Sequence, residues 1–362
     1  MLNFMEYGLR RYYDVIGWNQ DRYYTSLDAV PARILRFPVP VGLNLALGKR
    51  ISPVFKSAYS IRVSDRHSAA FMYSSVPVDL PPQPVHETLL PVALPSSSYL
   101  SFLPRSIRFS EPGTDALTQG GSVSGPNTPT TPALPSSWSQ NYPYILFGRI
   151  FDDLHLEGLY SQRVGQNTLL TASALSDFKL KGDLENDDSN INAQLIYNRP
   201  EICAELSVNS DNSIIGGSVL GQVSTNWAVG TEVYYTGKER SGGFSLGARY
   251  KKEYDARVQS ILTFVANPIM GHLNSAYSTT ILKDMQMATQ YDFNMYSFDA
   301  DVSVGVEYAP AGRGQVLKVA VGLVEGISLR FDGHFKDALY SIGMSTSFGS
   351  DPKPSFGFQI QF

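Results

Sequence analysis

The last eight residues of the chain, 355–362, alternate between large apolar side chains and small or polar ones. Side chains of a β-strand point to opposite faces with a period of two, so this segment has one apolar and one polar face when extended. The polar face argues against a strand that is buried on both sides. The apolar face, which needs an apolar partner, consists of Phe356, Phe358, Ile360 and Phe362.

The same alternation recurs in the segments 298–308, 327–335 and 340–348. A soluble β-sandwich and a transmembrane β-barrel both produce it, because they differ only in which face meets water. The segments are roughly ten residues long, the length that a tilted strand needs to cross a bilayer. Aromatic residues stand near their ends, as in the interfacial girdles of membrane barrels. Length and aromatic placement therefore favour the barrel.

Composition narrows the class further. The 362 residues, of which 43% are hydrophobic, are enough for one all-β barrel. The net charge of -4 and the lack of a sustained Lys/Arg cluster argue against a nucleic-acid partner. A single cysteine, Cys203, excludes an intramolecular disulfide framework, and we expect it to be a small apolar filler in a strand.

Two kinds of membrane signal are not found in the sequence. No stretch of about 18 apolar residues suggests a transmembrane helix. Residues 1–18 include Glu6, Arg10, Arg11 and Asp14 and lack the apolar core of a secretory signal. A barrel without such a signal is expected in a mitochondrial or plastid outer membrane.

The N-terminal part of the chain differs from the rest. Apolar residues at spacings of three and four in residues 1–18 predict an amphipathic helix. We therefore divide the chain into residues 1–34, an N-terminal helix and lead-in that is a candidate plug for the lumen, and residues 35–362, a transmembrane β-barrel. A long disordered or loop insertion is predicted around 111–142 from its Gly/Ser/Thr/Pro-rich composition, and 81–98 is similar.

The strands of the barrel can be counted from the alternation and the turn residues. Sixteen candidate strands separated by short turns follow from residue 143 to the end. Before them, we expect strands at 41–48 and around 71–73, and two further candidates at 99–102 and 106–109. The prediction is an all-β transmembrane β-barrel of roughly nineteen to twenty strands with an N-terminal amphipathic helix.

Several segments resemble one known family. Ser355-Phe356-Gly357-Phe358-Gln359-Ile360 matches the β-signal of mitochondrial barrels: polar, any, glycine, hydrophobic, any, hydrophobic. Three longer stretches, together with the N-terminal helix, are similar to the fungal mitochondrial distribution and morphology protein ten family. They are 267–278, 291–297 and Phe147-Gly148-Arg149. The resemblance covers most of the chain and is weakest in the loops at 81–142.

The resemblance implies both a fold and a set of partners. It implies a nineteen-strand β-barrel of the mitochondrial outer membrane that anchors the ER–mitochondria encounter structure, a tether that supports phospholipid exchange and mitochondrial morphology. It also implies association with the barrel and accessory subunits of the sorting and assembly machinery, with small translocase subunits and with membrane phospholipids. There the family promotes assembly of outer-membrane β-barrel proteins and of the outer-membrane translocase. An odd number of strands requires the first and last strands to pair in parallel.

Two aromatic pairs are candidate docking sites. Tyr291 and Phe293 share one strand face, and the resemblance implies that they dock the assembly machinery. Phe71 and Tyr73 form a similar pair on an early strand and are candidates for docking the tether partners. Composition alone favours ordinary interfacial girdles at both places. The third candidate site is the β-signal, with Ser355, Gly357, Phe358 and Ile360 as its defining residues.

Nothing in the sequence indicates an enzyme, a metal site or a cofactor. The carboxylates in 183–188 have no nearby His or Cys and predict a solvated hairpin turn. The five histidines lack metal-ligand spacing, and Gly312-Arg313-Gly314 is not a phosphate-binding loop. The charged residues of the alternating segments are expected in the lumen, because an Arg or Lys facing lipid at mid-bilayer costs about 2–4 kcal/mol. These residues are Asp299, Asp301, Glu307, Arg330, Asp332 and His334.

Three functions are compatible with these observations. The leading one is a barrel adaptor that anchors a lipid-transfer tether and assists barrel biogenesis. A metabolite-conducting mitochondrial porin is the first alternative, since an N-terminal helix and a polar lumen suit both. A soluble β-sandwich that binds a ligand is the second.

Overall fold

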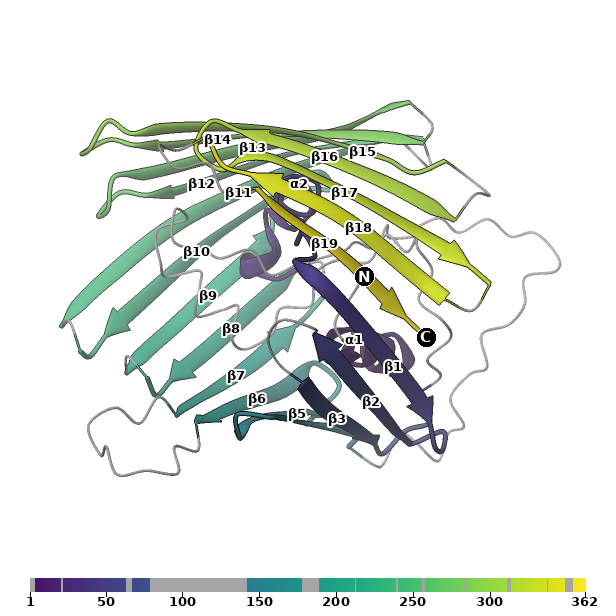
Figure 1. The fold of residues 1–362 in the computed structure, drawn as a ribbon. Helices are drawn as coiled ribbons and strands as arrows, with labels where there is room; N and C mark the ends of the chain where they lie inside the picture. Colours follow the sequence, from purple (N-terminus) through teal and green to yellow (C-terminus); the bar gives the residue numbers. More distant parts are fainter. Residues whose placement is uncertain are drawn as a thin grey trace, which may run out of the picture.

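Nineteen strands form one closed sheet in the computed structural model of the protein (Figure 1). Each strand pairs antiparallel with the next one along the chain, and β1 closes the barrel by pairing in parallel with β19. Both the strand number and the parallel closure predicted from the sequence are thereby confirmed. The structure describes residues 4–20, 22–62, 67–78, 142–177, 189–211, 213–238, 240–255, 258–282, 284–310, 314–336, 338–348 and 354–362.

Three short helical elements precede the barrel, and none of the described helices has the length and apolar character to cross a membrane. The helical elements are α1 (Phe4–Ile16), η1 (Tyr24–Ser26) and α2 (Ala29–Leu35). The first ten strands are β1 (Gly42–Arg50), β2 (Phe55–Arg62), β3 (His67–Ser74), β4 (Tyr144–Phe151), β5 (His155–Arg163), β6 (Thr168–Asp177), β7 (Asn190–Asn198), β8 (Ile202–Asn209), β9 (Ile214–Gln222) and β10 (Trp227–Thr236). The remaining nine are β11 (Ser241–Asp255), β12 (Val258–Asn267), β13 (His272–Leu282), β14 (Met285–Asn294), β15 (Ala300–Tyr308), β16 (Gln315–Gly322), β17 (Gly326–Phe335), β18 (Ala338–Thr346) and β19 (Ser355–Gln361).

The barrel has two rims, since successive strands run in opposite directions. We call the rim at which β19 ends the C-terminal rim. The connections that follow odd-numbered strands, such as β1 to β2 and β9 to β10, lie there. The opposite rim holds the connections that follow even-numbered strands, and β1 begins at that rim.

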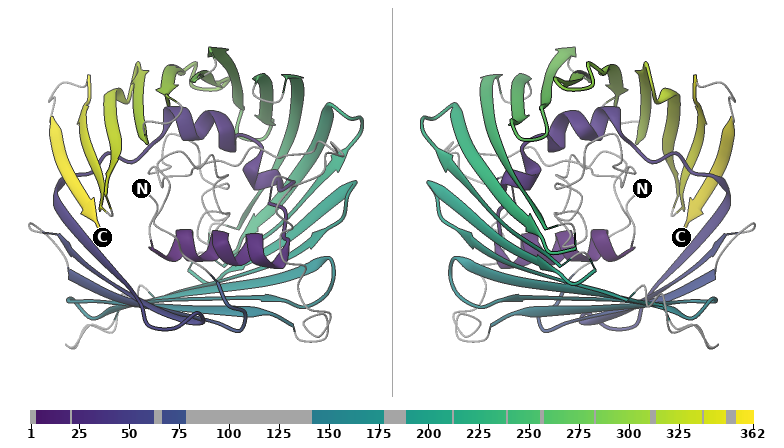
Figure 2. Two further views of the ribbon diagram at one scale, coloured as in Figure 1. Left: turned by 90° about the vertical axis from the view of Figure 1, so that its right-hand side faces the viewer. Right: turned by 90° about the vertical axis from the view of Figure 1, so that its left-hand side faces the viewer.

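The described residues between 4 and 41, which we call the inner segment, lie inside the barrel and follow its wall (Figure 2). The segment contacts the early strands first and the last strands at its end. Four hydrogen bonds mark this path: Tyr12 Oη to Pro143 O (2.7 Å), Tyr24 N to Glu205 Oε1 (2.8 Å), Arg33 Nη1 to Glu307 Oε1 (2.8 Å) and Arg330 Nη1 to Pro38 O (2.8 Å).

The main apolar core lies between α1 and the inner face of the early strands. The apolar face of α1 packs there because its residues recur at spacings of three and four, which places them on one side of a helix. On the barrel side, the same cluster takes inward residues of β3 to β8. Its most buried members include Leu9, Tyr12, Met72, Ile145, Phe147, Leu169 and Ile196.

The strand pattern of the sequence is largely confirmed. Sixteen strands, β4 to β19, follow residue 143, as the alternation predicted. The strand predicted for 41–48 is β1, and the one around 71–73 is β3. The strand β2, Phe55–Arg62, was not predicted. The candidate strands at 99–102 and 106–109, the loop at 81–98 and nearly all of the insertion at 111–142 lie outside the described residues.

Candidate functional site

The barrel has an inverted polarity, with apolar side chains outward and polar ones inward. In β15, Val304 points outward and is 40% exposed, whereas Glu307 points inward and is 6% exposed. The same division holds in β17, where Arg330 and Asp332 are buried on the inner side and form a 2.9 Å ion pair. This is the pattern expected of a barrel surrounded by an apolar medium.

Of the six charged residues predicted for the lumen, Asp299 is placed differently, and His334 shares the inner face of β17 with Arg330 and Asp332. Asp299 lies in the turn before β15 and is exposed, so its prediction was wrong. The strand β15 begins only at Ala300, later than the alternating segment 298–308 predicted, because Phe298 has a left-handed backbone (φ 58°) that interrupts the extended run. His334 is exposed near the end of β17, at the C-terminal rim. Asp301, Glu307, Arg330 and Asp332 lie on the inner face, as predicted.

A buried charge cluster anchors α2 to the inner wall. Glu307 Oε1 lies 2.8 Å from Arg33 Nη1, and its other oxygen lies 3.1 Å from Lys318 Nζ. Arg33 also donates a 2.5 Å hydrogen bond to Gln286 Oε1. Burial lowers the pKa of the Arg33 guanidinium, and the carboxylate of Glu307 opposes that shift. Among the described residues, the cluster thus sets one carboxylate from β15 against two buried cations.

A second charge cluster lies at the end of α2, near the opposite rim. Arg36 Nη2 is 3.4 Å from Asp292 Oδ2 of β14. Burial raises the pKa of Glu325, in the turn after β16, and Arg36 acts in the opposite direction. Asp301 and Asp292 raise it further by charge repulsion. Together, the two clusters fix the C-terminal end of α2 to the wall.

Tyr291 and Phe293 lie side by side on the outer face of β14. Their ring centroids are 6.3 Å apart with an interplanar angle of 8°, and Tyr291 is 45% exposed. Phe298, from the following turn, meets Phe293 edge to face at 6.5 Å. The structure thus brings the predicted pair together near the opposite rim and adds a third exposed ring to it.

The turns next to this pair are held together by hydrogen bonds. Met295 N donates to Gly271 O at 2.7 Å, and Tyr296 Oη donates to Pro268 O at 3.1 Å. Gly271 has a φ of +67°, and a Cβ atom there would lie 2.7 Å from the ring of Tyr296. A glycine is therefore required at this position, both by its backbone and by the ring. This requirement accounts for Gly271 in the segment 267–278 and for its contact with Tyr296 in the segment 291–297.

Phe71 and Tyr73 lie on the outer face of β3, near the C-terminal rim. Phe71 is 44% exposed and stacks on Phe55 at 6.5 Å, while Tyr73 lies 6.1 Å from Tyr144. Phe71 lies across Gly148 of β4, where a Cβ atom would be 2.5 Å from two of its ring atoms. The predicted pair is thus part of a larger ridge of aromatic rings on β2 to β4.

The two aromatic pairs lie on opposite sides of the barrel. Strands β3 and β14 are eleven positions apart in one direction (14 − 3) and eight in the other (19 − 11) around the closed sheet. The Phe71/Tyr73 pair lies toward the C-terminal rim, and the Tyr291/Phe293 pair lies toward the opposite rim. A partner at one pair would leave the other uncovered.

The β-signal forms the seam of the barrel. Phe358 and Ile360 pair in register with Leu43 and Leu45 of β1, and Ser355 Oγ lies 2.6 Å from Ser345 Oγ. On the inner face, a Cβ atom at Gly357 would collide with the carbonyl group of Pro40. Each β-signal residue thus has a place in the seam. Phe358 and Ile360 are apolar and point outward, and the hydroxyl of Ser355 pairs with β18. Gly357 leaves room for the inner segment.

The sequence reasoning did not identify Arg33, Arg36 and Lys318 as functional residues. The signal that could have found them is charge balance, because inward carboxylates such as Glu307 require buried cations nearby. Within the described ranges, no group of three or more His, Cys, Asp or Glu side chains could hold a metal ion. The carboxylates in 183–188 lie outside those ranges.

Comparisons with known proteins give one family by sequence. A family model described as Mitochondrial distribution and morphology protein 10 matches residues 1–313. The chain is similar to the protein of that name from Coprinopsis cinerea, with 24% identity over 99% of this chain and 98% of the relative. It is also similar to that from Yarrowia lipolytica, with 26% identity over 96% of this chain and 95% of the relative. Among solved structures, a triple mutant of the Rhodopseudomonas blastica porin matches with a TM-score of 0.40 and 9% identity, over 60% of this chain and 90% of that one.

Proposed function

The chain belongs to the Mitochondrial distribution and morphology protein 10 family, and from this premise we propose that it is an integral β-barrel of the mitochondrial outer membrane that acts as an adaptor. In this role it anchors the ER–mitochondria tether that supports phospholipid exchange. It also associates with the sorting and assembly machinery and promotes assembly of outer-membrane barrels and of the translocase.

The inverted polarity of the wall is the observation that supports the membrane location best. Outward residues such as Val304 and Tyr308 are exposed and apolar, while charged residues point inward to the inner segment. Water around such a barrel would meet a large continuous apolar surface, which soluble monomers rarely expose. Alkaline carbonate extraction of mitochondria tests this proposal. We expect the protein in the membrane pellet, whereas a soluble β-sandwich would be released.

The arrangement of the two aromatic pairs supports an adaptor with two partners. Exposed aromatic side chains provide much of the binding energy of protein interfaces. Tyr291/Phe293 and Phe71/Tyr73 lie on opposite sides of the barrel and toward different rims. We assign the first pair to the assembly machinery, as the resemblance implies, and the second to the tether, because the two pairs lie on different strands toward different rims.

A crosslinking pull-down with the tagged full-length protein from detergent-solubilised mitochondria tests this assignment. The double variants Tyr291→Ala/Phe293→Ala and Phe71→Ala/Tyr73→Ala are each expected to lose one partner and to keep the other. Tyr197→Ala/Tyr235→Ala is the matched control, because it removes two outward exposed rings from β7 and β10, between the two sites. We expect it to keep both partners.

Three results would contradict the adaptor function or the assignment of its two docking sites. If the wild-type protein resists carbonate extraction but recovers neither partner, the adaptor function is refuted and the porin function remains. Loss of both partners in the control would show that any outward ring is needed for insertion. Retention of both partners in both double variants would show that the pairs are ordinary girdle residues.

The porin remains the alternative because the inner face of the wall is polar. Buried and half-buried polar side chains line the lumen, among them Asp301, Gln194 and Asn274. Conductance of the purified protein in planar bilayers distinguishes the two functions. A steady conductance of the purified protein, in which neither partner is present, would favour the porin.

A further inference from the structure

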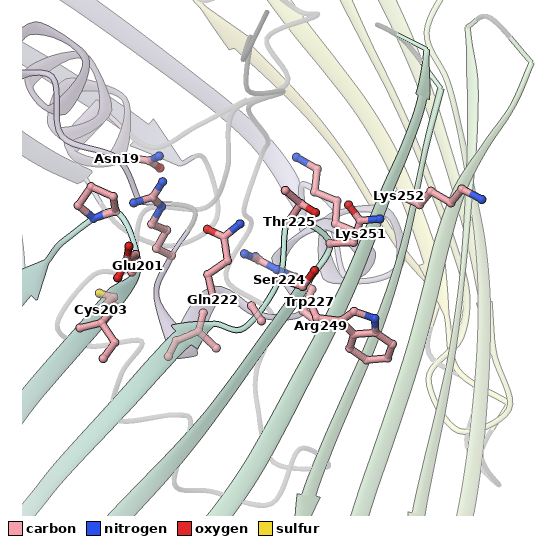
Figure 3. Close-up of a pocket in the computed structure, with 16 residues that line it drawn as sticks. Asn19, Glu201, Cys203, Gln222, Ser224, Thr225, Trp227, Arg249, Lys251 and Lys252 are labelled. Atoms are coloured by element: carbon pink, nitrogen blue, oxygen red, sulfur yellow. The ribbon is translucent and has the colours of Figure 1, made fainter.

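A pocket with a strongly basic lining lies at the C-terminal rim, away from both aromatic pairs. We call it the rim pocket (Figure 3). Its volume is about 490 Å³, within the usual size range of small-ligand sites. The strands β8 to β11 and the inner segment contribute to it. Its charged lining residues are Arg22, Arg249, Lys251, Lys252 and Glu201.

The positive charge of the lining residues favours an anionic ligand. Among the described residues, three cationic side chains (Arg22, Arg249 and Lys251) and the carboxylate of Glu201 face this space, so their formal charges sum to a positive value. Neutral hydrogen-bonding groups from Asn19, Gln222 and the turn 224–226 face the same space. Arginine and lysine side chains with amide and hydroxyl groups around them are suited to the oxygens of a phosphate group.

The walls of the rim pocket are held in place by the backbone. Lys251 N donates a 2.8 Å hydrogen bond to Asn226 O, and Gln222 N donates one of 2.8 Å to Glu201 O. The inner segment is fixed in the same way, because Arg22 Nη1 donates to Arg199 O at 3.0 Å. The backbone around the pocket and the side chain of Arg22 are therefore positioned before any ligand binds.

The outer face of the same strand ends shows where the rim pocket lies relative to a bilayer. Trp227 and Tyr250 point outward and their ring centroids are 4.9 Å apart. Trp and Tyr are enriched at the level of the lipid headgroups. Lys251 points inward and Lys252 is exposed on the other side of the strand, so cations lie on both sides of the wall at this level.

We infer that the rim pocket binds the phosphate group of an anionic phospholipid, whose headgroup reaches over the rim while its chains stay outside the barrel. This inference rests on the proposed location of the barrel in a membrane. Basic pockets at membrane interfaces commonly bind anionic headgroups. A phospholipid headgroup and a soluble phosphate ester offer the same phosphate group to this pocket. The experiment below therefore compares a lipid with a soluble phosphate ester.

Native mass spectrometry of the full-length protein, released from detergent micelles, measures the lipid that remains bound. The probes are phosphatidic acid, phosphatidylcholine and soluble glycerol 3-phosphate. Each basic residue near an anionic headgroup contributes roughly five-fold to affinity, so Arg249→Gln/Lys251→Gln should weaken phosphatidic acid binding by roughly 30-fold. The matched control is Lys49→Gln/Arg50→Gln, which removes two adjacent cations from the end of β1 at the same rim.

We expect the wild-type protein and the control to retain phosphatidic acid in preference to phosphatidylcholine, and the rim-pocket variant to lose that preference. Equal retention by all three proteins, or an equal loss in the control, would overturn the inference. If glycerol 3-phosphate at the same concentration displaces phosphatidic acid, the assignment to a lipid would be overturned and the site would be assigned to a soluble phosphate ester. Arg22→Gln lies outside the strands and should weaken binding roughly five-fold, so it tests the site even if the double variant does not fold.

This measurement is independent of the adaptor proposal. It uses purified protein in detergent and needs neither the tether nor the assembly machinery. Failure of the pull-down would leave the lipid result unchanged, and failure of lipid retention would leave the partners unchanged.

Discussion

Removal of the carboxylate of Glu307 tests how the inner segment is held in the barrel. Glu307→Gln keeps the size of the side chain but removes the charge that faces both Arg33 and Lys318. The side chains of these two cations are only 3% and 6% exposed, so water cannot take the place of the carboxylate. The variant therefore leaves two buried positive charges close to each other.

The size of the effect follows from this burial. Removal of one partner from a buried ion pair costs about 3–5 kcal/mol. The amide oxygen of the new Gln can still accept one hydrogen bond, so we expect the lower end of that range, about 3 kcal/mol. Since each 1.4 kcal/mol is a factor of ten, the unfolding equilibrium constant should rise by roughly 100-fold.

Two measurements on the detergent-refolded protein check this expectation. Urea unfolding gives the loss of stability, and limited trypsin digestion reports whether the chain becomes cleavable at Arg33 and Arg36. The control is Glu157→Gln, whose partner Arg149 lies 3.2 Å away but whose side chain is 26% exposed. Such a pair is expected to contribute less than about 1 kcal/mol.

A double-mutant cycle gives the result that would refute the reasoning. Arg33→Gln in the Glu307→Gln background removes one of the two unbalanced cations, so it should recover part of the lost stability. Strictly additive losses, or equal losses in the variants of Glu307 and Glu157, would show that the cluster does not hold the inner segment by charge balance.

Three further predictions follow from the wall itself. Gly357→Ala should slow or prevent closure because its methyl group meets the backbone of the inner segment, whereas Gly158→Ala, whose methyl group would lie 4.0 Å from the nearest atom, Phe147 O, should refold normally in a gel-shift assay. Val304→Arg should block assembly in isolated mitochondria, at a cost of about 2–4 kcal/mol at mid-bilayer, and Asp301→Arg should be tolerated. Glu325→Gln should raise the urea midpoint at pH 7 but not near pH 4. The pKa of Glu325 is raised on folding, so the wild type loses stability as the pH rises from the unfolded pKa through the folded one.

The strand meander was predictable because each strand meets two different media. In late strands such as β15 and β17, outward apolar and inward polar residues alternate, and the period of two is visible in the sequence. On β4 to β8, several inward residues are apolar because they pack against α1. The strand β2 was not predicted because its two faces do not differ clearly in polarity. Its outward face includes Ser57 and its inward face includes the buried Lys56. The alternation is therefore weak there, and the strand is held mainly by its neighbours.

The path of the inner segment could not be predicted from the local sequence. The helix α2 has seven residues, too few to be stable alone, and it forms because Arg33 and Arg36 pair with carboxylates of distant strands. The aromatic pairs could be placed on strands by their spacing. Their positions on opposite sides of the barrel depend on the strand number and on closure, which are properties of the whole sheet.

The route of the inner segment also determines on which side of a membrane the two ends of the chain lie. With nineteen strands, β1 begins at the opposite rim, while β19 ends at the C-terminal rim. The inner segment crosses back through the lumen, since Tyr12 and Asn19 contact residues at the C-terminal rim. The part of the inner segment around Tyr12 and Asn19 therefore lies at the same rim as the end of β19, although strand parity alone would place the residues before β1 at the opposite rim.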